Sequence, residues 1–249
     1  MMKQHQVLDL FAGIGGFTVG LDKLPNFRTV AFCEQDKECQ EVLKKNWPDV
    51  PIYSDIKELT YEQLKTDGIK PDVITGGFPC QDISVAGRGE GLKGERSGLW
   101  FEYARLIGEV GPRWVIIENV SILRSRGLVT ILQNLSEIGY DAEWHCITAS
   151  YVGAPHQRDR IWVLADPKSE RVQGYRPSRE QEPYPYAEQK VSLCNGKGQR
   201  STFWEVEPNV GRVVNGVRKR THRIKQLGNA VVPQIPQFLG EQINRIEGN

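Results

Sequence analysis

The sequence predicts an α/β fold, with a mostly parallel β-sheet covered by helices on both faces. Short β-branched runs alternate with segments of helical apolar spacing from the N-terminus to about residue 166. Regular alternation of this kind is typical of parallel sheets, in which the helices cover both faces. With 249 residues, the chain is long enough for one such domain and a small appended module.

Each expected element has its own signal along the chain. Strands are expected where apolar and β-branched residues run together, over 6–11, 28–34, 72–77, 113–120 and 160–166. Helices are expected where apolar residues recur at helical spacing, over 15–24, 36–47, 98–110 and 127–139. A further strand is expected to end near Asp55, in "YSDI".

The alternation stops near Asp166. Residues 166–223 are polar, rich in Pro, Gly and charge, and without clear periodicity, which predicts a small irregular insert. An apolar turn and an amphipathic helix follow over 224–246. We therefore expect a catalytic domain formed by residues 1–165 plus 224–249, interrupted by the insert.

Composition limits the class of protein. No apolar run approaches the roughly 20 residues that span a bilayer, and the N-terminus lacks the features of a signal peptide, so a cytoplasmic protein without a membrane anchor is expected. The five cysteines form no Cys-x-x-Cys pair and the four histidines are scattered, which predicts neither a disulfide framework nor a metal site.

The net charge of +1 conceals an uneven distribution. Residues 168–225 carry 13 Lys and Arg against 6 Asp and Glu, a local balance of +7. Residues 211–225 contain six basic residues and no acidic one. Such a run is most often a solvated surface, but beside a catalytic domain it suits contacts with phosphates.

A glycine-rich turn follows the first expected strand in "VLDLFAGIGGF" (7–17). It is not the dinucleotide fingerprint, because Thr18 stands where the third glycine belongs. Glu34 ends the second strand 19 residues after Gly15, where an acid would reach ribose hydroxyls. Asp55 is a further acid, which a turn or a helix cap would explain equally well. Acids at successive strand ends suit a nucleoside cofactor without a pyrophosphate, and S-adenosylmethionine fits better than NAD.

A cysteine stands in an unusual place in "ITGGFPCQDIS" (74–84). The chain leaves a strand through two glycines, and Pro79 stiffens the loop just before Cys80. A buried cysteine is usually a small apolar filler. A thiol on a rigid loop at the carboxyl end of a strand is instead placed like a nucleophile.

Three charged residues could complete a catalytic group. Glu118 ends the strand "RWVIIENV" at the same sheet edge, where partial burial would raise its pKa and favour a protonated acid; the alternative is a capping residue. Arg158 and Arg160 lie two residues apart just before or within a strand, so both can point to one face. Such arginine pairs are often only solvent-facing.

Five blocks of the chain resemble the DNA (cytosine-5) methyltransferases. They are "DLFAGIGGF", "GGFPCQDIS", "ENV", "QRDR" and "QLGNAVVP", in the order and approximate spacing of that family, and the resemblance covers about residues 5–165 and 224–240. It implies a Rossmann-like, S-adenosylmethionine-dependent methyltransferase fold in which the insert is a short target-recognition region. "GRVVNGVRKRTHR" (211–223) is the candidate for the family's arginine-rich block.

The resemblance also implies roles for individual residues. Cys80 matches the nucleophile that adds to carbon 6 of a flipped cytosine, Glu118 the acid at ring nitrogen 3, and Arg160, with Arg158 nearby, the group that binds the cytosine carbonyl. The matching positions of the S-adenosylmethionine pocket are Phe11, Gly13, Gly15, Glu34, Asp55, Ile56, Pro79, Asn229 and Val231. The expected DNA contacts are Gln81, Ser84, Arg88, Lys93, Arg96, Arg218, Lys219, Arg220 and Arg223.

The implied partner is double-stranded DNA, the implied product S-adenosylhomocysteine, and no metal is expected. A cognate restriction endonuclease and a monomeric state are further expectations. Two alternatives stay open. One branch of the family methylates cytosine in transfer RNA with the same Cys and Glu blocks, although the short insert favours DNA. A catalytically inactive, nucleic-acid-binding relative is the other, although Cys80, Glu118 and both arginines are retained.

Overall fold

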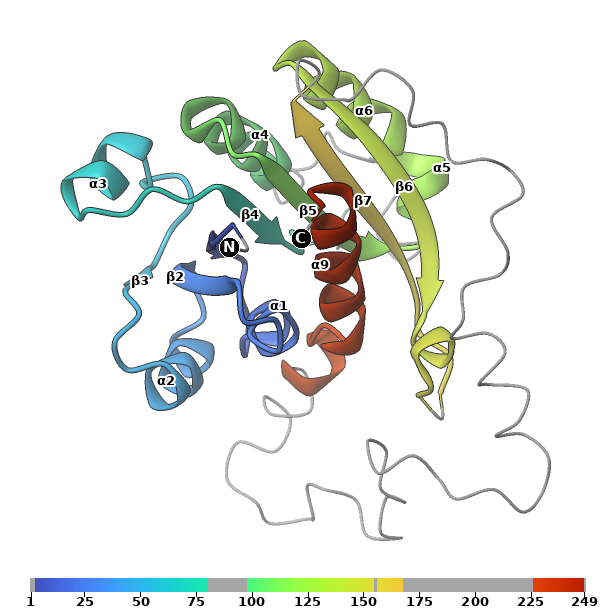
Figure 1. Cartoon of the computed structure of the whole chain (residues 1–249), viewed down its shortest axis with the longest axis horizontal. Helices are drawn as coiled ribbons and strands as arrows, with labels where there is room; N and C mark the ends of the chain where they lie inside the picture. The colour runs from blue at the N-terminus through green and yellow to red at the C-terminus, as the bar shows by residue number, and fades with distance from the viewer. Residues whose placement is uncertain (1–2, 80–97, 155, 168–225, 249) are drawn as a thin grey trace, which may run out of the picture.

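The computed structural model describes residues 3–79, 98–154, 156–167 and 226–248 (Figure 1). The strands are β1 (His5–Leu10), β2 (Phe27–Cys33), β3 (Ile52–Tyr53), β4 (Val73–Gly76), β5 (Trp114–Val120), β6 (Tyr140–Thr148) and β7 (Asp159–Pro167). The helices are α1 (Gly16–Leu21), α2 (Lys37–Asn46), α3 (Tyr61–Thr66), α4 (Gly98–Val110), α5 (Leu123–Arg126), α6 (Leu128–Glu137), the 3₁₀ helix η2 (Ala149–Val152) and α9 (Gln234–Ile246).

The seven strands form one sheet in the order β3-β2-β1-β4-β5-β7-β6. β1 to β5 pair in parallel, whereas β7 is antiparallel to both of its neighbours. The prediction of a mostly parallel sheet is confirmed. The reversal of β7 has one important effect: Arg160, at its start, pairs with Val120, at the end of β5. Residues that begin β7 therefore lie at the carboxyl edge of the parallel strands.

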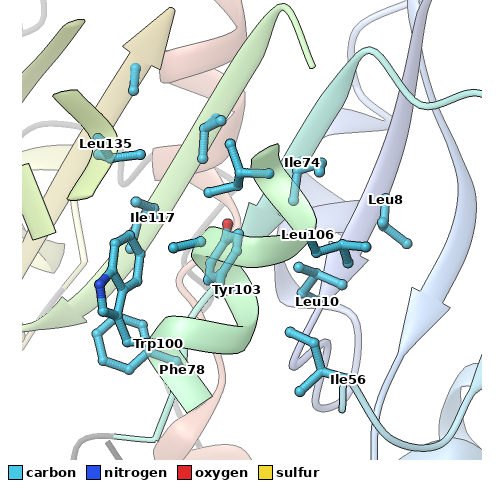
Figure 2. Packing of buried hydrophobic residues seen from close by; sticks show 14 of the residues in the cluster. Leu8, Leu10, Ile56, Ile74, Phe78, Trp100, Tyr103, Leu106, Ile117 and Leu135 are labelled. Atoms are coloured by element: carbon cyan, nitrogen blue, oxygen red, sulfur yellow. The ribbon is translucent and has the colours of Figure 1, made fainter. Parts of the chain in front are cut away.

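One face of the sheet is covered by α4 and α6, over the larger core cluster (Figure 2). Trp100 and Tyr103 of α4 are fully buried, with ring centroids 5.8 Å apart. The Tyr103 hydroxyl donates to the carbonyl of Ile116 at 3.2 Å, so its polar end is satisfied. Phe78, beyond the end of β4, packs on Trp100 with 5.6 Å between ring centroids. Because burial of each large side chain contributes roughly 1.5–3 kcal/mol, this contact fixes the segment that leaves β4.

The opposite face is covered by α1 and α9, which lie side by side although their sequences are far apart (Figure 1). Ile235, Leu239 and Ile243 of α9 join Phe17 and Leu21 of α1 in a second core cluster. A glycine makes this close approach possible, since a Cβ at position 20 would lie 2.1 Å from a carbonyl oxygen. The C-terminal helix α9 therefore packs against the N-terminal part of the chain.

Some elements were not expected from the sequence. β6 carries a mixed run, "YDAEWHCIT", and four of its residues are exposed, because it is the edge strand. Neither a buried-strand run nor a clean alternation marks it. α3, α5 and η2 are only four to six residues long, too short for a helical period to register. The proposed boundary of the insert, 166–223, lies almost entirely outside the described residues and stays a prediction.

In the part of the chain that the structure describes, no helix is both long and apolar enough to cross a membrane.

The amino ends of the strands carry a cluster of paired charges that fixes the end of α9. His5, which is 1% exposed, lies between Asp72 Oδ2 at 3.0 Å and Glu247 Oε2 at 3.2 Å. Glu247 also accepts from Trp114 Nε1 at 2.8 Å and pairs with Arg113. This cluster joins β1, β5 and the C-terminus.

Replacing Glu247 by glutamine is expected to destabilise the fold by about 1.5–3 kcal/mol near neutral pH, the usual value of hydrogen bonds to a charged group. Burial opposes ionisation of Glu247, but the bonds from Trp114 and Arg113 outweigh it and lower its pKa. A lowered folded pKa stabilises the protein above the unfolded value of 4.5, and this contribution disappears as the pH falls through the folded pKa. Urea unfolding of Glu247→Gln should therefore differ most from wild type at neutral pH.

The exposed Glu58 supplies the control for this experiment, because Glu58→Gln removes the same charge from a solvated side chain. Its free energy of unfolding should stay within about 0.5 kcal/mol of wild type. Equal stabilities of Glu247→Gln and Glu58→Gln would contradict the role given to the cluster.

Candidate functional site

The carboxyl ends of the parallel strands surround a cavity of about 510 Å³. This is the edge at which α/β folds bind ligands, and the volume suits one drug-sized molecule. The cavity is lined by eleven of the residues predicted from the sequence, contributed by several strand ends and by the C-terminal segment: Phe11, Gly13, Glu34, Asp55, Ile56, Pro79, Glu118, Arg158, Arg160, Asn229 and Val231.

The glycine-rich turn after β1 forms one wall of the cavity. Phe11 adopts a positive φ of 52°, which is rare for a residue with a side chain, and such conformations cluster at functional sites. Gly13 has a φ of 55°, and a Cβ built there meets nothing within 4 Å. The turn therefore presents bare backbone to the cavity.

Gly15 also belongs to the predicted pocket, but the structure gives it a different place. It is the N-cap of α1, with a φ of 87°, and its N–H donates to the Ala12 carbonyl at 2.8 Å. A Cβ there would lie 2.6 Å from the ring of Trp47. Gly15 is not among the lining residues, so its observable role is to shape the turn.

Glu34 joins the turn to the second strand. Its Oε2 accepts the N–H of Gly13 at 2.7 Å, and its Oε1 accepts the N–H of Asp36 at 2.7 Å. Burial raises the pKa of this carboxyl, and the backbone donors oppose the rise. A carboxylate has about four acceptor positions. Glu34 can therefore hold the turn and still accept hydrogen bonds from a ligand in the cavity.

The Asp55–Ile56 segment forms the far wall. Asp55 Oδ1 accepts the N–H of Lys57 at 2.9 Å, which is the turn role that the sequence left open as an alternative. The residue also lines the cavity, so both interpretations remain compatible with its position. Arg105 of α4 fixes this wall by donating to the carbonyls of Ile56 at 2.9 Å and Leu59 at 3.0 Å.

Glu118 lies at the end of β5 and is 8% exposed. Arg160 Nε is 2.9 Å from its Oε1. Its Oε2 lies against the backbone of Gly77, where a Cβ would come within 2.8 Å. Burial raises the pKa of Glu118, while the positive charges of Arg160 and Arg158 lower it. Burial is the largest of these effects, and the net direction is upward, as expected for a carboxyl that carries a proton.

Arg158 connects the edge of the sheet at the cavity to the C-terminal segment. Its Nη1 donates to the carbonyl of Gly228 at 2.5 Å. Burial and the neighbouring charge of Arg160 lower the pKa of its guanidinium, and Glu118 opposes them. The two arginines therefore line the same cavity but have different partners. Arg158 is held by the Gly228 carbonyl, whereas Arg160 pairs with Glu118.

Further contacts bring the C-terminal segment over the cavity. Gln226 Nε2 donates to Cys39 Sγ at 3.3 Å. A Cβ at Gly16 would lie 2.9 Å from both the Cβ and the carbonyl oxygen of Val231, so only glycine permits this contact. Asn229 and Val231 reach the cavity wall because these contacts hold the segment that carries them.

The residues predicted from the sequence did not include Asn119, which lines the cavity, or Asp9, which lies outside its lining. Asn119 donates from Nδ2 to the carbonyl of Phe78 at 3.1 Å, and its Oδ1 accepts the N–H of Val120 at 2.8 Å. It thereby ties the segment after β4 to the end of β5. Asp9 is buried beneath the glycine turn. Its place at the end of an apolar strand was visible in "VLDLF", and Asn119 directly follows Glu118, so a polar residue at a strand end was the available signal.

The remaining predicted residues lie outside the described part of the chain: Cys80, Gln81, Ser84, Arg88, Lys93, Arg96, Arg218, Lys219, Arg220 and Arg223. The described segment that precedes Cys80 ends at Pro79, on the cavity wall. Within the described residues, no group of three or more His, Cys, Asp or Glu side chains is placed to hold a metal ion.

Comparison with known proteins gives consistent matches. The family model described as C-5 cytosine-specific DNA methylase matches residues 5–211. The Type II methyltransferase M2.BsuMI of Bacillus subtilis (strain 168) is 38% identical over 175 residues, which cover 66% of this chain and 43% of that protein. M.CviJI of Paramecium bursaria Chlorella virus IL3A is 35% identical over 161 residues, covering 64% and 42%.

Solved structures show the same fold. A protein encoded within an Escherichia coli prophage superposes with a TM-score of 0.57 at 27% identity, covering 67% of this chain and 47% of that one. DNMT2 of Spodoptera frugiperda superposes with a TM-score of 0.58 at 21% identity, covering 70% and 54%. The chain spans less than half the length of the curated relatives that it matches. Since the family model covers most of the chain, this protein belongs to the C-5 cytosine-specific DNA methylase family.

Proposed function

We propose that this protein transfers a methyl group from S-adenosylmethionine to carbon 5 of cytosine in double-stranded DNA. The observation that carries the proposal is the arrangement around Glu118. A buried carboxyl with a raised pKa, held by Arg160, lies in the same cavity as a glycine turn tied to Glu34. A carboxylic acid that can act on the cytosine ring and a binding site for a nucleoside cofactor thus lie in the same cavity.

The described residues fit S-adenosylmethionine. Glu34 offers carboxylate oxygens where ribose hydroxyls would lie, and Gly13 leaves backbone open to the ligand. Asp55, Ile56, Asn229 and Val231 would line the rest of the pocket. When bound, S-adenosylmethionine supplies an electrophilic methyl group on its sulfonium, and S-adenosylhomocysteine would be the product.

The residues of this chain would act on the cytosine ring. Cytosine carbon 5 is a weak nucleophile, so the Cys80 thiolate adds to carbon 6 and forms a covalent bond with the ring. Glu118 donates a proton or a hydrogen bond to nitrogen 3 and so neutralises the negative charge that this addition would otherwise place on the ring. Arg160 donates to the cytosine carbonyl oxygen. Carbon 5 can then accept the methyl group, a base removes the carbon 5 proton, and elimination releases the Cys80 thiolate.

The target base must leave the helix stack to reach this cavity, at a cost of a few kcal/mol. Phe78 and Pro79 mark where it would enter, since they line the wall from which the chain continues to Cys80. Arg88, Lys93 and Arg96, which follow Cys80 in the sequence, and the basic residues 218–223 would contact phosphates. We propose DNA as the polymer because the matching family model is described as a C-5 cytosine-specific DNA methylase, and the prophage structure as a DNA modification methyltransferase. A cognate restriction endonuclease would then be the partner enzyme.

Labelled S-adenosylmethionine tests the function directly. The purified chain is incubated with unmethylated bacterial DNA or with bulk transfer RNA, and the product is mapped at base resolution. Label on carbon 5 of DNA cytosines within one short motif is the expected result. Label on RNA alone would support the proposed methyl-transfer reaction but contradict the proposal that DNA is the substrate. Cofactor binding without transfer to either polymer would indicate an inactive relative.

Replacing Glu34 by glutamine is expected to weaken S-adenosylmethionine binding by roughly 10–100-fold, because a hydrogen bond to a charged group is typically worth about 1.5–3 kcal/mol. The amide nitrogen of glutamine would face one of the two backbone N–H donors that Glu34 accepts. Isothermal titration calorimetry measures the effect. Glu41→Gln removes an exposed carboxylate from the neighbouring helix α2 and should bind like wild type. Equal affinities of the two variants would contradict the role of Glu34.

A further inference from the structure

We propose that Asp9 is a positioning residue that links the glycine turn of the cofactor pocket to the segment that carries the chain from β4 to the cavity wall. The inference rests on the proposed function, in which the glycine turn binds the cofactor and the segment after β4 lies beside the cytosine. Asp9 does not line the cavity itself. It would act through its contacts with two threonines, Thr18 and Thr75.

Asp9 lies at the carboxyl end of β1 and has no exposed surface. Its Oδ2 accepts from the Thr18 hydroxyl, on α1, at 3.0 Å. Its Oδ1 accepts from the Thr75 hydroxyl, on β4, at 2.9 Å. Thr18 and Thr75 are themselves fully buried. One carboxyl group is thus shared between the helix that follows the glycine turn and the strand that precedes Gly76.

The hydrogen-bond network of Asp9 extends through Thr18 to Thr29. The Thr29 hydroxyl, on β2, donates to the Thr18 hydroxyl at 3.0 Å, and Thr18 donates onward to Asp9. Each hydroxyl gives its single proton once, and the carboxyl receives two. Loss of one member leaves a buried polar group without its partner, which is the costly case for an interior hydrogen bond. The network can therefore hold β1, β2, β4 and α1 in one arrangement.

The two linked parts lie next to the proposed chemistry. Thr18 is three residues beyond Gly15, the N-cap of the helix after the turn. Thr75 immediately precedes Gly76, and residues 77–79 line the cavity beside Glu118. A Cβ at Gly76 would lie 2.9 Å from the carbonyl of Leu10, so the strand ends are in contact and a shift of one displaces the other. Displacements of about 1 Å can change catalytic rates by about 10²-fold.

The environment of Asp9 is consistent with this role. Its pKa is raised to about 7, mainly by burial and also by the nearby charge of Glu34, while the hydrogen bonds from Thr75 and Thr18 lower it. A buried carboxyl is unfavourable for stability, so a fold that keeps one beside its cofactor turn gains something other than packing.

The threonine on β4 allows a nearly isosteric test. In the full chain, Thr75→Val removes the hydroxyl, Thr75→Ser restores it, and Thr66→Val removes an exposed hydroxyl elsewhere as the control. Two quantities are measured: kcat on DNA at saturating S-adenosylmethionine, and the Kd for S-adenosylmethionine by calorimetry. Circular dichroism and the Tm show that each variant is folded.

For Thr75→Val, we expect kcat to fall by roughly 10–100-fold and the Kd to rise several-fold, although Thr75 does not line the cavity. Thr75→Ser should return both values to within about threefold of wild type, and Thr66→Val should match wild type. A role in stability alone would lower the Tm and leave both values unchanged.

A folded Thr75→Val with wild-type kcat and Kd would overturn the proposal, as would a serine variant as impaired as the valine variant. Absence of methyl transfer by the wild-type protein on any polymer would instead overturn the proposed function. The Kd comparison needs no turnover, so it would still decide the role of Asp9. A wild-type protein that binds no S-adenosylmethionine would overturn both.

Discussion

Replacing Cys80 by serine is expected to abolish methyl transfer to DNA, with a fall of roughly 10³-fold or more, because an alcohol adds to carbon 6 far more slowly than a thiolate. The two residues that precede Cys80 in the sequence are held at the cavity. Phe78 is fixed by packing of its ring, tilted by 45°, against Trp100 and by the bond from Asn119, and Pro79 lies on the cavity wall. Residue 80 is therefore the next along a chain path that is fixed up to the cavity.

Cys146 provides a matched control, because it is an exposed cysteine on β6 and does not line the cavity. Cys146→Ser should transfer methyl groups at the wild-type rate, and both variants should bind S-adenosylmethionine normally. DNA containing 5-fluorocytosine adds a direct measurement, since fluorine at carbon 5 cannot leave as a proton does. Wild-type protein should form a stable covalent complex with this DNA, whereas Cys80→Ser should form none. Full activity of Cys80→Ser would disprove the covalent mechanism.

Glu118→Gln is expected to reduce methyl transfer by roughly 10²–10⁴-fold, the usual contribution of a general acid. Glutamine keeps the shape of the side chain and can still accept from Arg160, but its amide can donate only a hydrogen bond and cannot transfer a proton to nitrogen 3. S-adenosylmethionine binding should be unchanged, because Glu34 and the glycine turn are untouched. Glu143→Gln, at an exposed position on β6, is the control for the loss of charge.

The pH dependence gives a second test of Glu118. Burial raises its pKa above the ordinary value of 4.5, so its acid form persists to higher pH than in a solvated glutamate. Activity that depends on this acid should be highest below the folded pKa and fall as the pH rises through it. The contribution of Glu118 to stability has the same direction, since it is complete below pH 4.5 and is lost through the folded pKa. An identical profile for wild type and Glu118→Gln would show that another group sets this limb.

Several parts of the fold and the site follow from local sequence. The apolar run of β1 and the glycines after it predict a strand and a turn, and Gly13 indeed has a positive φ. The spacing of Glu34 from the turn predicts their proximity, and the structure joins them at 2.7 Å. These features depend on residues close together in the chain or on the regular geometry of parallel strands, so a periodic pattern is sufficient to predict them.

The edge strand β6 shows why other parts could not be predicted. Exposed residues of several kinds make up its middle, because only one strand borders it and little apolar surface is required. The link through Asp9 was also hidden. Thr18 reads simply as the residue that replaces a glycine of the dinucleotide fingerprint, whereas it contacts Asp9, and Asp9 contacts Thr75, 66 positions along the chain.

The sequence by itself determined the alternating α/β order, the glycine turn with Glu34, and the polar residues at the ends of strands. These features could be predicted because helical or strand periodicity and the ends of strands depend on residues that are close together in the chain. Only the tertiary structure decided that Arg160 contacts Glu118 and that Arg158 lines the same cavity. In a parallel strand, residues at the start would lie at the opposite edge of the sheet; β7 runs antiparallel, and this reversal brings Arg160 beside Val120 and the Glu118 carboxyl. Strand direction depends on pairing between distant segments, and no local pattern records it.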